Sequence, residues 1–285
     1  MVMSPAAGTI LSEWSPPIAL YVTLLVSALV YLRGWVLLRR SSPGLLGAQR
    51  LAAFLVGLFS LWIAIGSPLS AFDEASLAVH MVQHILLMLV APPFILLGAP
   101  TLPFLHGLPQ WLVRRIFGPV FRFGPVQALG AFLTHPIVCW GMSAVALIVW
   151  HVPAAFELAL QSDSWHAVEH ICFLATSLLF WWPVVQPYPS EVRWPRWIIP
   201  LYLFLGMLPS GVLGAFLTFS DRVLYPSYLH QPAMFGLTPL EEQIFAGSLM
   251  WVLGMFVCII PAVIITLKML SPRVLQPGSA RSLDA

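Results

Sequence analysis

Charge is what this sequence has least of. Only 8% of its 285 residues are Asp, Glu, Lys or Arg, and 59% are hydrophobic, whereas a soluble globular protein carries roughly 25% charged residues. So few charges cannot cover a soluble globule, and several apolar runs reach the roughly 20 residues that a membrane-spanning helix needs. The composition therefore excludes a soluble domain and predicts an all-α integral membrane protein.

Paired cysteines and nucleotide-binding motifs are also missing. The three cysteines, Cys139, Cys172 and Cys258, are scattered through apolar runs and form no CxxC pair, so a disulfide framework has no support. No glycine-rich phosphate loop and no nucleophile elbow is present, so familiar nucleotide-dependent and serine-hydrolase sites have no support. The net charge of only +2 gives no basic surface for nucleic acid.

The apolar runs predict one seven-helix transmembrane domain over residues 1–285, embedded in a lipid bilayer. The N-terminus has no basic region before its first apolar run and carries Glu13, so we expect a permanent first span rather than a cleaved signal peptide. The predicted spans are approximately 17–38, 50–66, 77–97, 131–150, 165–186, 197–219 and 242–268.

Basic residues lie almost entirely on one side of this seven-span arrangement. Arg222 alone falls on the other side, and the acids of the connections, such as Asp73 and Asp163, sit opposite the basic residues. The positive-inside rule then places the N-terminus outside and the C-terminus in the cytoplasm of a bacterial plasma membrane. The twelve basic residues on the cytoplasmic side are Arg33, Arg39, Arg40, Arg50, Arg114, Arg115, Arg122, Arg193, Arg196, Lys268, Arg273 and Arg281.

Tryptophans lie near both predicted boundaries and are expected as interfacial anchors. Trp150 and Trp165 lie at the outer boundary, and the inner group is Trp181, Trp182, Trp194 and Trp197.

Two histidine pairs open the third and fifth predicted spans. His80 and His84 are four residues apart, and so are His166 and His170, which places each pair on one face of its helix. Ionisable side chains in a membrane segment are costly and usually functional. We expect the two spans to be neighbours, with His84 facing His170. His151 lies at the same outer level, whereas His230 is expected to be solvated and His106 and His135 to be structural.

A metal ion is the simplest chemical explanation for this clustering. Imidazole suits copper, zinc, iron and nickel, and two ligands four residues apart on a helix can bind one ion. Glu169, beside His170, could bind the ion directly or orient a ligand. Met81 and Met88 would add thioether sulfur and favour Cu(I), although ordinary core packing also explains them. The site prediction is copper at the outer face.

Two other functions use the same histidines. One is a haem-binding or electron-transfer protein, in which a histidine from each span is an axial ligand. The other is a zinc-dependent intramembrane hydrolase, in which Glu169 would act as the general base.

Four sequence blocks resemble the CtaG family of cytochrome c oxidase assembly proteins of the seven-span type. They are HMVQHILLMLVAPPFILLGAP (80–100), WHVPAAFELAL (150–160), HAVEH (166–170) and TPLEEQIFAGSLMW (238–251). The resemblance runs from about residue 75 onward, whereas the first two spans match only in hydrophobicity.

The resemblance implies a non-enzymatic factor that matures a haem–copper oxidase by handling copper, with an oxidase subunit as its membrane partner. Glu242 and Gln243 stand where the family often has Asp-Gln, so Glu242 keeps an acid there and is a secondary candidate for a metal ligand. The family's histidine positions are matched by His80, His84, His151, His166 and His170.

Overall fold

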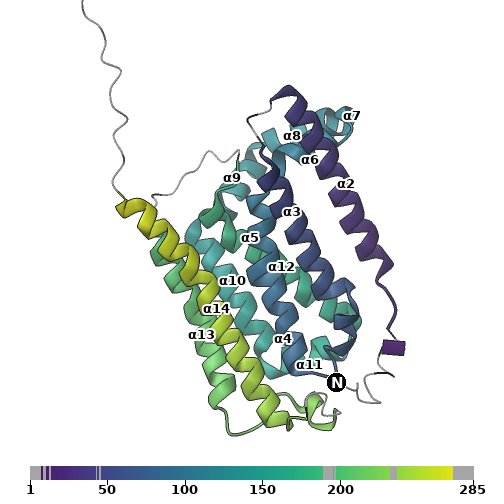
Figure 1. The fold of residues 1–285 in the computed structure, drawn as a ribbon, viewed down its shortest axis with the longest axis vertical. Helices are drawn as coiled ribbons and strands as arrows, with labels where there is room; N and C mark the ends of the chain where they lie inside the picture. Colours follow the sequence, from purple (N-terminus) through teal and green to yellow (C-terminus); the bar gives the residue numbers. More distant parts are fainter. Residues whose placement is uncertain are drawn as a thin grey trace, which may run out of the picture.

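The structure is a computed structural model that describes residues 8, 11–12, 14–42, 44, 46–188, 195, 197–231 and 236–271. All regular structure within these residues is helical, which confirms the predicted all-α class (Figure 1). The α-helices are α2 (Ile18–Ser41), α3 (Ala48–Leu61), α4 (Leu77–Ile85), α5 (Ala91–Leu97), α6 (Thr101–Gly107), α7 (Gln110–Leu112), α8 (Gly118–Arg122), α9 (Gly124–Leu133), α10 (Pro136–His151), α11 (Pro153–Leu160), α12 (Asp163–Val185), α13 (Ile198–Phe219) and α14 (Pro239–Leu270). Three π turns, η1 (Trp62–Gly66), η3 (Leu86–Val90) and η4 (Val113–Phe117), and two 3₁₀ turns, η2 (Pro68–Phe72) and η5 (Pro226–His230), complete them.

The number of helices able to cross a membrane lies between six and eight in the described part of the chain. Two bent helix pairs make the difference: residues 110–133 bend by 71° and residues 136–160 by 75°. The predicted seven spans fall within this range, and the predicted orientation stays a prediction. The six unbroken candidates are Ile18–Ser41, Ala48–Phe72, Leu77–Leu97, Asp163–Val185, Ile198–Phe219 and Pro239–Leu270.

The predicted start of the fourth span is wrong. The prediction began at residue 131, but α9 ends at Leu133 and a new helix begins at Pro136. Proline lacks an N–H group and fits the first position of a helix, and it disfavours helical geometry in the residue before it. His135 accordingly has an extended backbone, with φ −69° and ψ 129°.

The span formed by α4, η3 and α5 lies at the centre of the bundle. It contacts α3, α12 and α14, and it is the most deeply buried of the candidate spans. The α13–α14 pair forms one flank and α2 the opposite flank (Figure 1). The outer face of α2 exposes apolar side chains such as Ile18 and Leu25, as expected of a helix facing hydrocarbon.

Trp181 joins the central span to α12. Pro92 has no N–H group to offer the Met88 carbonyl one turn earlier, and the Trp181 indole donates to that carbonyl at 3.0 Å instead. Trp181 is buried, with 3% of its surface exposed. The prediction that Trp181 is an interfacial anchor is therefore wrong, because the central span supplies its indole N–H with a polar partner inside the bundle.

Several residues used in the topology prediction lie outside the described part of the chain. They are Glu13, Arg193, Trp194, Arg196, Arg273 and Arg281.

Candidate metal centre

Polar caps at the N-terminus of α4 fix the helix that carries the first histidine pair. The Ser76 hydroxyl accepts a hydrogen bond from the Val79 N–H at 3.4 Å, as a helix N-cap does. The Glu242 carboxylate accepts from the Ser76 hydroxyl and from the Ala78 N–H. Glu242, predicted as a secondary metal candidate, thus has an oxygen engaged at the helix end, where it holds α4 against α14.

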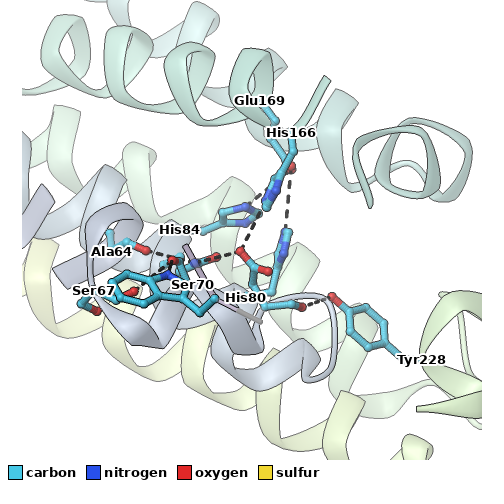
Figure 2. Close-up of polar contacts among 11 residues, drawn as sticks. Ala64, Ser67, Ser70, His80, His84, His166, Glu169 and Tyr228 are labelled. Atoms are coloured by element: carbon cyan, nitrogen blue, oxygen red, sulfur yellow. Dashed lines mark hydrogen bonds and ion pairs between the residues drawn. The ribbon is translucent and has the colours of Figure 1, made fainter. Parts of the chain in front are cut away.

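The histidine pairs of α4 and α12 face each other, as the sequence predicted. The ring centroids of His84 and His170 are 5.9 Å apart, and those of His80 and His166 are 5.3 Å apart. Figure 2 shows His166 extending from α12 toward His80 and His84 of α4. Four imidazoles from two helices thus occupy one volume of the protein interior.

Glu169 lies between the two α4 histidines. Its carboxylate oxygens are 3.5 Å from His84 Nε2 and 4.0 Å from His80 Nε2, and the side chain is fully buried. One ligand atom from each of these three residues lies within 4.8 Å of the other two. Around a tetrahedral ion with bonds of about 2.0–2.1 Å, donor atoms lie about 3.4 Å apart, so modest side-chain movement brings all three to one ion.

His151 reaches the same volume from α10. Its Nδ1 lies 2.8 Å from the Leu147 carbonyl oxygen, and because a carbonyl only accepts, Nδ1 carries the proton. The Nε2 lone pair then remains for a ligand, and this atom is buried without a hydrogen-bond partner. The ring centroid is 5.7 Å from that of His84. A carbonyl that holds the other ring nitrogen is the usual orienting contact of a metal-binding histidine.

Six side chains of this group carry buried polar atoms with no hydrogen-bond partner. Leaving such a group unpaired costs roughly 1–3 kcal/mol, so six of them weigh heavily against a total stability of about 5–15 kcal/mol. An ion that accepts one lone pair from each ligand would remove part of that cost, and neutral imidazoles with one carboxylate suit a divalent transition metal. The atoms are His80 Nδ1 and Nε2, His84 Nδ1 and Nε2, His151 Nε2, His166 Nε2, Glu169 Oε1 and Oε2, and His170 Nε2.

Asp73 and Gln83 border the centre, and the sequence argument did not assign them to it. Gln83 Nε2 donates to Asp73 Oδ2 and to the Ala64 carbonyl, each at 3.0 Å. Asp73 Oδ2 lies 3.9 Å from His166 Nε2. Burial raises the pKa of the Asp73 carboxyl to about 6, and the Gln83 hydrogen bond offsets part of this effect. The signal was available: Gln83 is an amide inside an apolar run, directly before His84.

Three aromatic side chains, Phe156, Tyr225 and Tyr228, cover the centre; we call them the aromatic cover. The Phe156 ring stacks on Tyr225 at 3.9 Å and lies 5.0 Å from the His80 ring. Tyr228 donates to the Asp73 carbonyl at 2.8 Å (Figure 2), and Tyr225 donates to the His151 carbonyl at 3.1 Å. All three are buried. Phe156 belongs to α11, and both tyrosines belong to the segment that follows α13, so this segment and α11 together cover the centre.

The two methionine candidates, and two histidines that were not expected to be ligands, lie outside this group. Met81 is fully buried in an apolar cluster with Leu77 and Phe156, in agreement with ordinary packing. Met88 adjoins a cavity next to His84. His230 is exposed on η5, and the exposed His106 has its Nδ1 at 3.0 Å from the Leu102 carbonyl.

Comparison with known proteins identifies relatives but no structural template. The chain is 25% identical over 244 residues to uncharacterized proteins of Mycobacterium bovis and Mycobacterium tuberculosis, covering 78% of this chain and 35% of each relative. An uncharacterized protein of Mycobacterium leprae is 23% identical over 204 residues, covering 65% and 29%. The chain thus spans about a third of the length of the curated relatives it matches. No solved structure matches it.

A family model extends the resemblance toward the N-terminus. It describes the cytochrome c oxidase caa3 assembly factor (Caa3_CtaG) and matches residues 29–271. The match begins within α2, so the expected start near residue 75 is wrong; the second span and part of the first also carry the family's pattern. This coverage, with the histidine blocks inside it, shows that the chain belongs to the family of cytochrome c oxidase caa3 assembly factors.

Proposed function

We propose that this chain binds copper through its histidine–glutamate centre and supplies the metal during assembly of a haem–copper oxidase. The observation that carries the proposal is the group of buried imidazoles around Glu169 that lack hydrogen-bond partners. Such a group is unfavourable by itself and favourable around a cation. The role is one of binding and delivery, and no catalytic step is assigned to it.

The donor set supports copper. Imidazole and carboxylate bind several divalent metals, and in the general order of affinities Cu²⁺ binds N and O donors most tightly. Imidazoles bind as neutral groups, so the site can take the ion without burying a large negative charge. The family to which the chain belongs is named for a haem–copper oxidase, and such an enzyme needs copper to mature.

The dimensions of the site argue for an ion rather than a haem. The cavity that adjoins His84 is about 60 Å³, whereas pockets for organic ligands occupy roughly 300–1,000 Å³. Phe156 and Phe173 pack against His80 and His84 at ring distances of 5.0 and 4.6 Å. A porphyrin plane between the histidine pairs would displace both rings.

The location of the centre fits delivery at the outer face of a bacterial plasma membrane. The described basic residues of α2, α8 and η4 gather at one end of the bundle, and α11 lies at the other end with the start of α4 (Figure 1). Under the positive-inside rule the histidine end faces outward. An oxidase subunit spanning the same bilayer is the proposed partner.

The test removes one imidazole and measures both the metal and the partner. His84→Ala should leave insertion and abundance near normal, because it removes an unpaired polar group from an apolar helix. It should lower the copper content of the purified protein and the oxidase activity of membranes from cells carrying it. His106→Ala, at an exposed position outside the centre, is the matched control.

Parallel loading with copper, zinc and haem separates the competing functions. Full copper content together with full oxidase activity in the His84→Ala protein would remove the assignment. A haem absorption band lost in this variant would favour a haem protein, and zinc retained in preference to copper would favour a hydrolase.

A further inference from the structure

The histidine–glutamate centre contains more donor groups than one ion can take. Cu²⁺ with nitrogen and oxygen ligands favours about four close donors, whereas five histidines and Glu169 carry buried donor atoms without hydrogen-bond partners. Asp73, beside His166, adds a second buried carboxylate. A single ion held by His80, His84 and Glu169 would leave the other imidazoles unpaired in the protein interior, which is costly.

Glu169 presents its two oxygens to different histidines. Oε1 lies 3.5 Å from His84 Nε2, and Oε2 lies 4.0 Å from His80 Nε2 (Figure 2). A carboxylate in this orientation can bridge two metal ions, one on each oxygen, and the ions of two-metal sites lie about 3.5–4 Å apart. The carboxylate therefore divides the centre into a His84 side and a His80 side.

The donors on the His84 side come from three helices, α4, α10 and α12. The ring centroids of His151 and His170 lie 5.7 and 5.9 Å from that of His84. Both residues have a buried Nε2 atom without a hydrogen-bond partner, and the Leu147 carbonyl orients the His151 ring. With Glu169 Oε1, these three imidazoles supply the about four donors that one Cu²⁺ ion takes.

The donors on the His80 side include the second carboxylate. The His166 ring lies parallel to the His80 ring with 5.3 Å between centroids, and His166 Nε2 is 3.9 Å from Asp73 Oδ2. Gln83 Nε2 donates to the same Asp73 oxygen at 3.0 Å, the kind of outer contact that orients a carboxylate ligand. With Glu169 Oε2, these two imidazoles and Asp73 supply the donors of a second ion.

Charge also favours a second cation on the His80 side. Asp73 and Glu169 supply negative charge among neutral imidazoles, which offsets part of the charge of two divalent ions. The exposed carboxylates of Glu74 and Asp163 lie near enough to His166 to interact with it electrostatically. Further negative charge thus faces this side of the centre from the protein surface.

We propose that the centre binds two divalent copper ions, bridged by the Glu169 carboxylate. The first ion is held by His84, His151 and His170, and the second by His80, His166 and Asp73. The inference rests on the proposed function and gives the copper centre a capacity of two ions per chain. The side chains of His166 and Asp73 are 15% and 9% exposed, whereas that of His84 is 2% exposed, so the second ion is the first to leave.

The experiment titrates the purified, metal-free chain with Cu²⁺ and measures copper bound per chain together with electron paramagnetic resonance. Two Cu²⁺ ions bridged by a carboxylate couple magnetically, which weakens the ordinary signal and gives a half-field transition. Asp73→Asn combined with His166→Ala removes two donors of the second ion, and His151→Ala combined with His170→Ala removes two donors of the first. His106→Ala, at an exposed position outside the centre, is the matched control.

We expect two coupled Cu²⁺ ions per chain in wild type and control, and one ion with the ordinary signal in each double variant. One ion per chain in wild type, or two ions without coupling, would overturn this proposal and leave the copper-binding function standing. Two coupled ions in either double variant would overturn the ligand assignment. Wild type that binds no copper would refute the proposed function itself.

A milder variant keeps the proposal testable where a double variant does not fold. Asp73→Asn alone is nearly isosteric and keeps an oxygen that accepts from Gln83 Nε2. It must weaken the binding of one copper ion by tenfold or more and leave the other ion bound. Unchanged affinity for both ions in this variant would overturn the second site.

Discussion

The Trp181 indole and the Met88 carbonyl join the two helices that carry the histidine pairs. The 3.0 Å hydrogen bond lies one turn beyond His84 on the central span and three turns beyond His170 on α12, at the carbonyl that Pro92 leaves without a partner. The contact therefore fixes α12 against the central span, deeper in the bundle than the histidine pairs.

Replacing Trp181 with Phe should destabilise the protein and weaken the centre. The substitution leaves a buried carbonyl unpaired, which costs roughly 1–3 kcal/mol, and frees α12 to shift relative to His84. We expect a lower thermal unfolding midpoint in detergent and reduced copper retention. Trp182→Phe is the control, and equal losses in the two variants would show that the hydrogen bond is unimportant.

Glu169→Gln should change metal affinity and metal-free stability in opposite directions. The amide removes a ligand charge, so we expect copper affinity to fall by tenfold or more, the size of effect that even outer contacts of metal ligands produce. It also removes a buried, unpaired carboxylate, so the metal-free protein should unfold at a higher temperature. Glu74→Gln, at an exposed position, should change neither quantity; a parallel fall of both in the Glu169 variant would contradict the assignment.

Asp73 should make the metal-free protein less stable as the pH rises from about 4 to 6. Its pKa is raised from 3.8 to about 6 in the folded protein. Between these pH values the folded state binds more protons than the unfolded state, so the free energy of unfolding falls as the pH rises through this window. The shift corresponds to at most about 3 kcal/mol. Asp73→Asn should remove this slope while keeping an oxygen that accepts from Gln83. Unfolding midpoints in chelator across this range provide the measurement, and an unchanged slope would assign the dependence elsewhere.

The orientation in the membrane is tested by reporter fusions. A fusion in the connection around Arg114 should report the cytoplasm, and one near Asp163 should report the outside, because basic residues gather at the former end. The same compartment for both fusions would contradict the seven-span topology.

Local spacing was sufficient to predict much of the centre. The four-residue separation within each histidine pair predicted that both imidazoles lie on one face of their helix. The cost of placing imidazole in lipid predicted that these two faces meet. His84 and His170 do face each other. The start of α10 was also readable, because Pro136 is a suitable first residue of a helix, but the apolar run around it concealed the break.

Contacts between distant segments could not be predicted in the same way. A tryptophan near the end of a span, such as Trp181, is usually an interfacial anchor. Only the packing of α12 against η3 reveals that its indole has a carbonyl partner. The roles of Tyr225 and Tyr228 depend on where the segment after α13 folds back, which no periodicity encodes. Glu242 likewise acts on Ser76, 166 residues away in sequence.

The aromatic cover sets how fast an ion can be exchanged. Its tyrosines hold backbone carbonyls of Asp73 and His151, and Glu157 anchors the adjoining segment through hydrogen bonds from the Ser227 N–H and hydroxyl. Copper held beneath it would leave only when these contacts open together, so association and dissociation would both be slow. Long residence favours direct transfer between docked proteins over release into the surrounding water, and it protects the cell from free copper while the oxidase is being assembled.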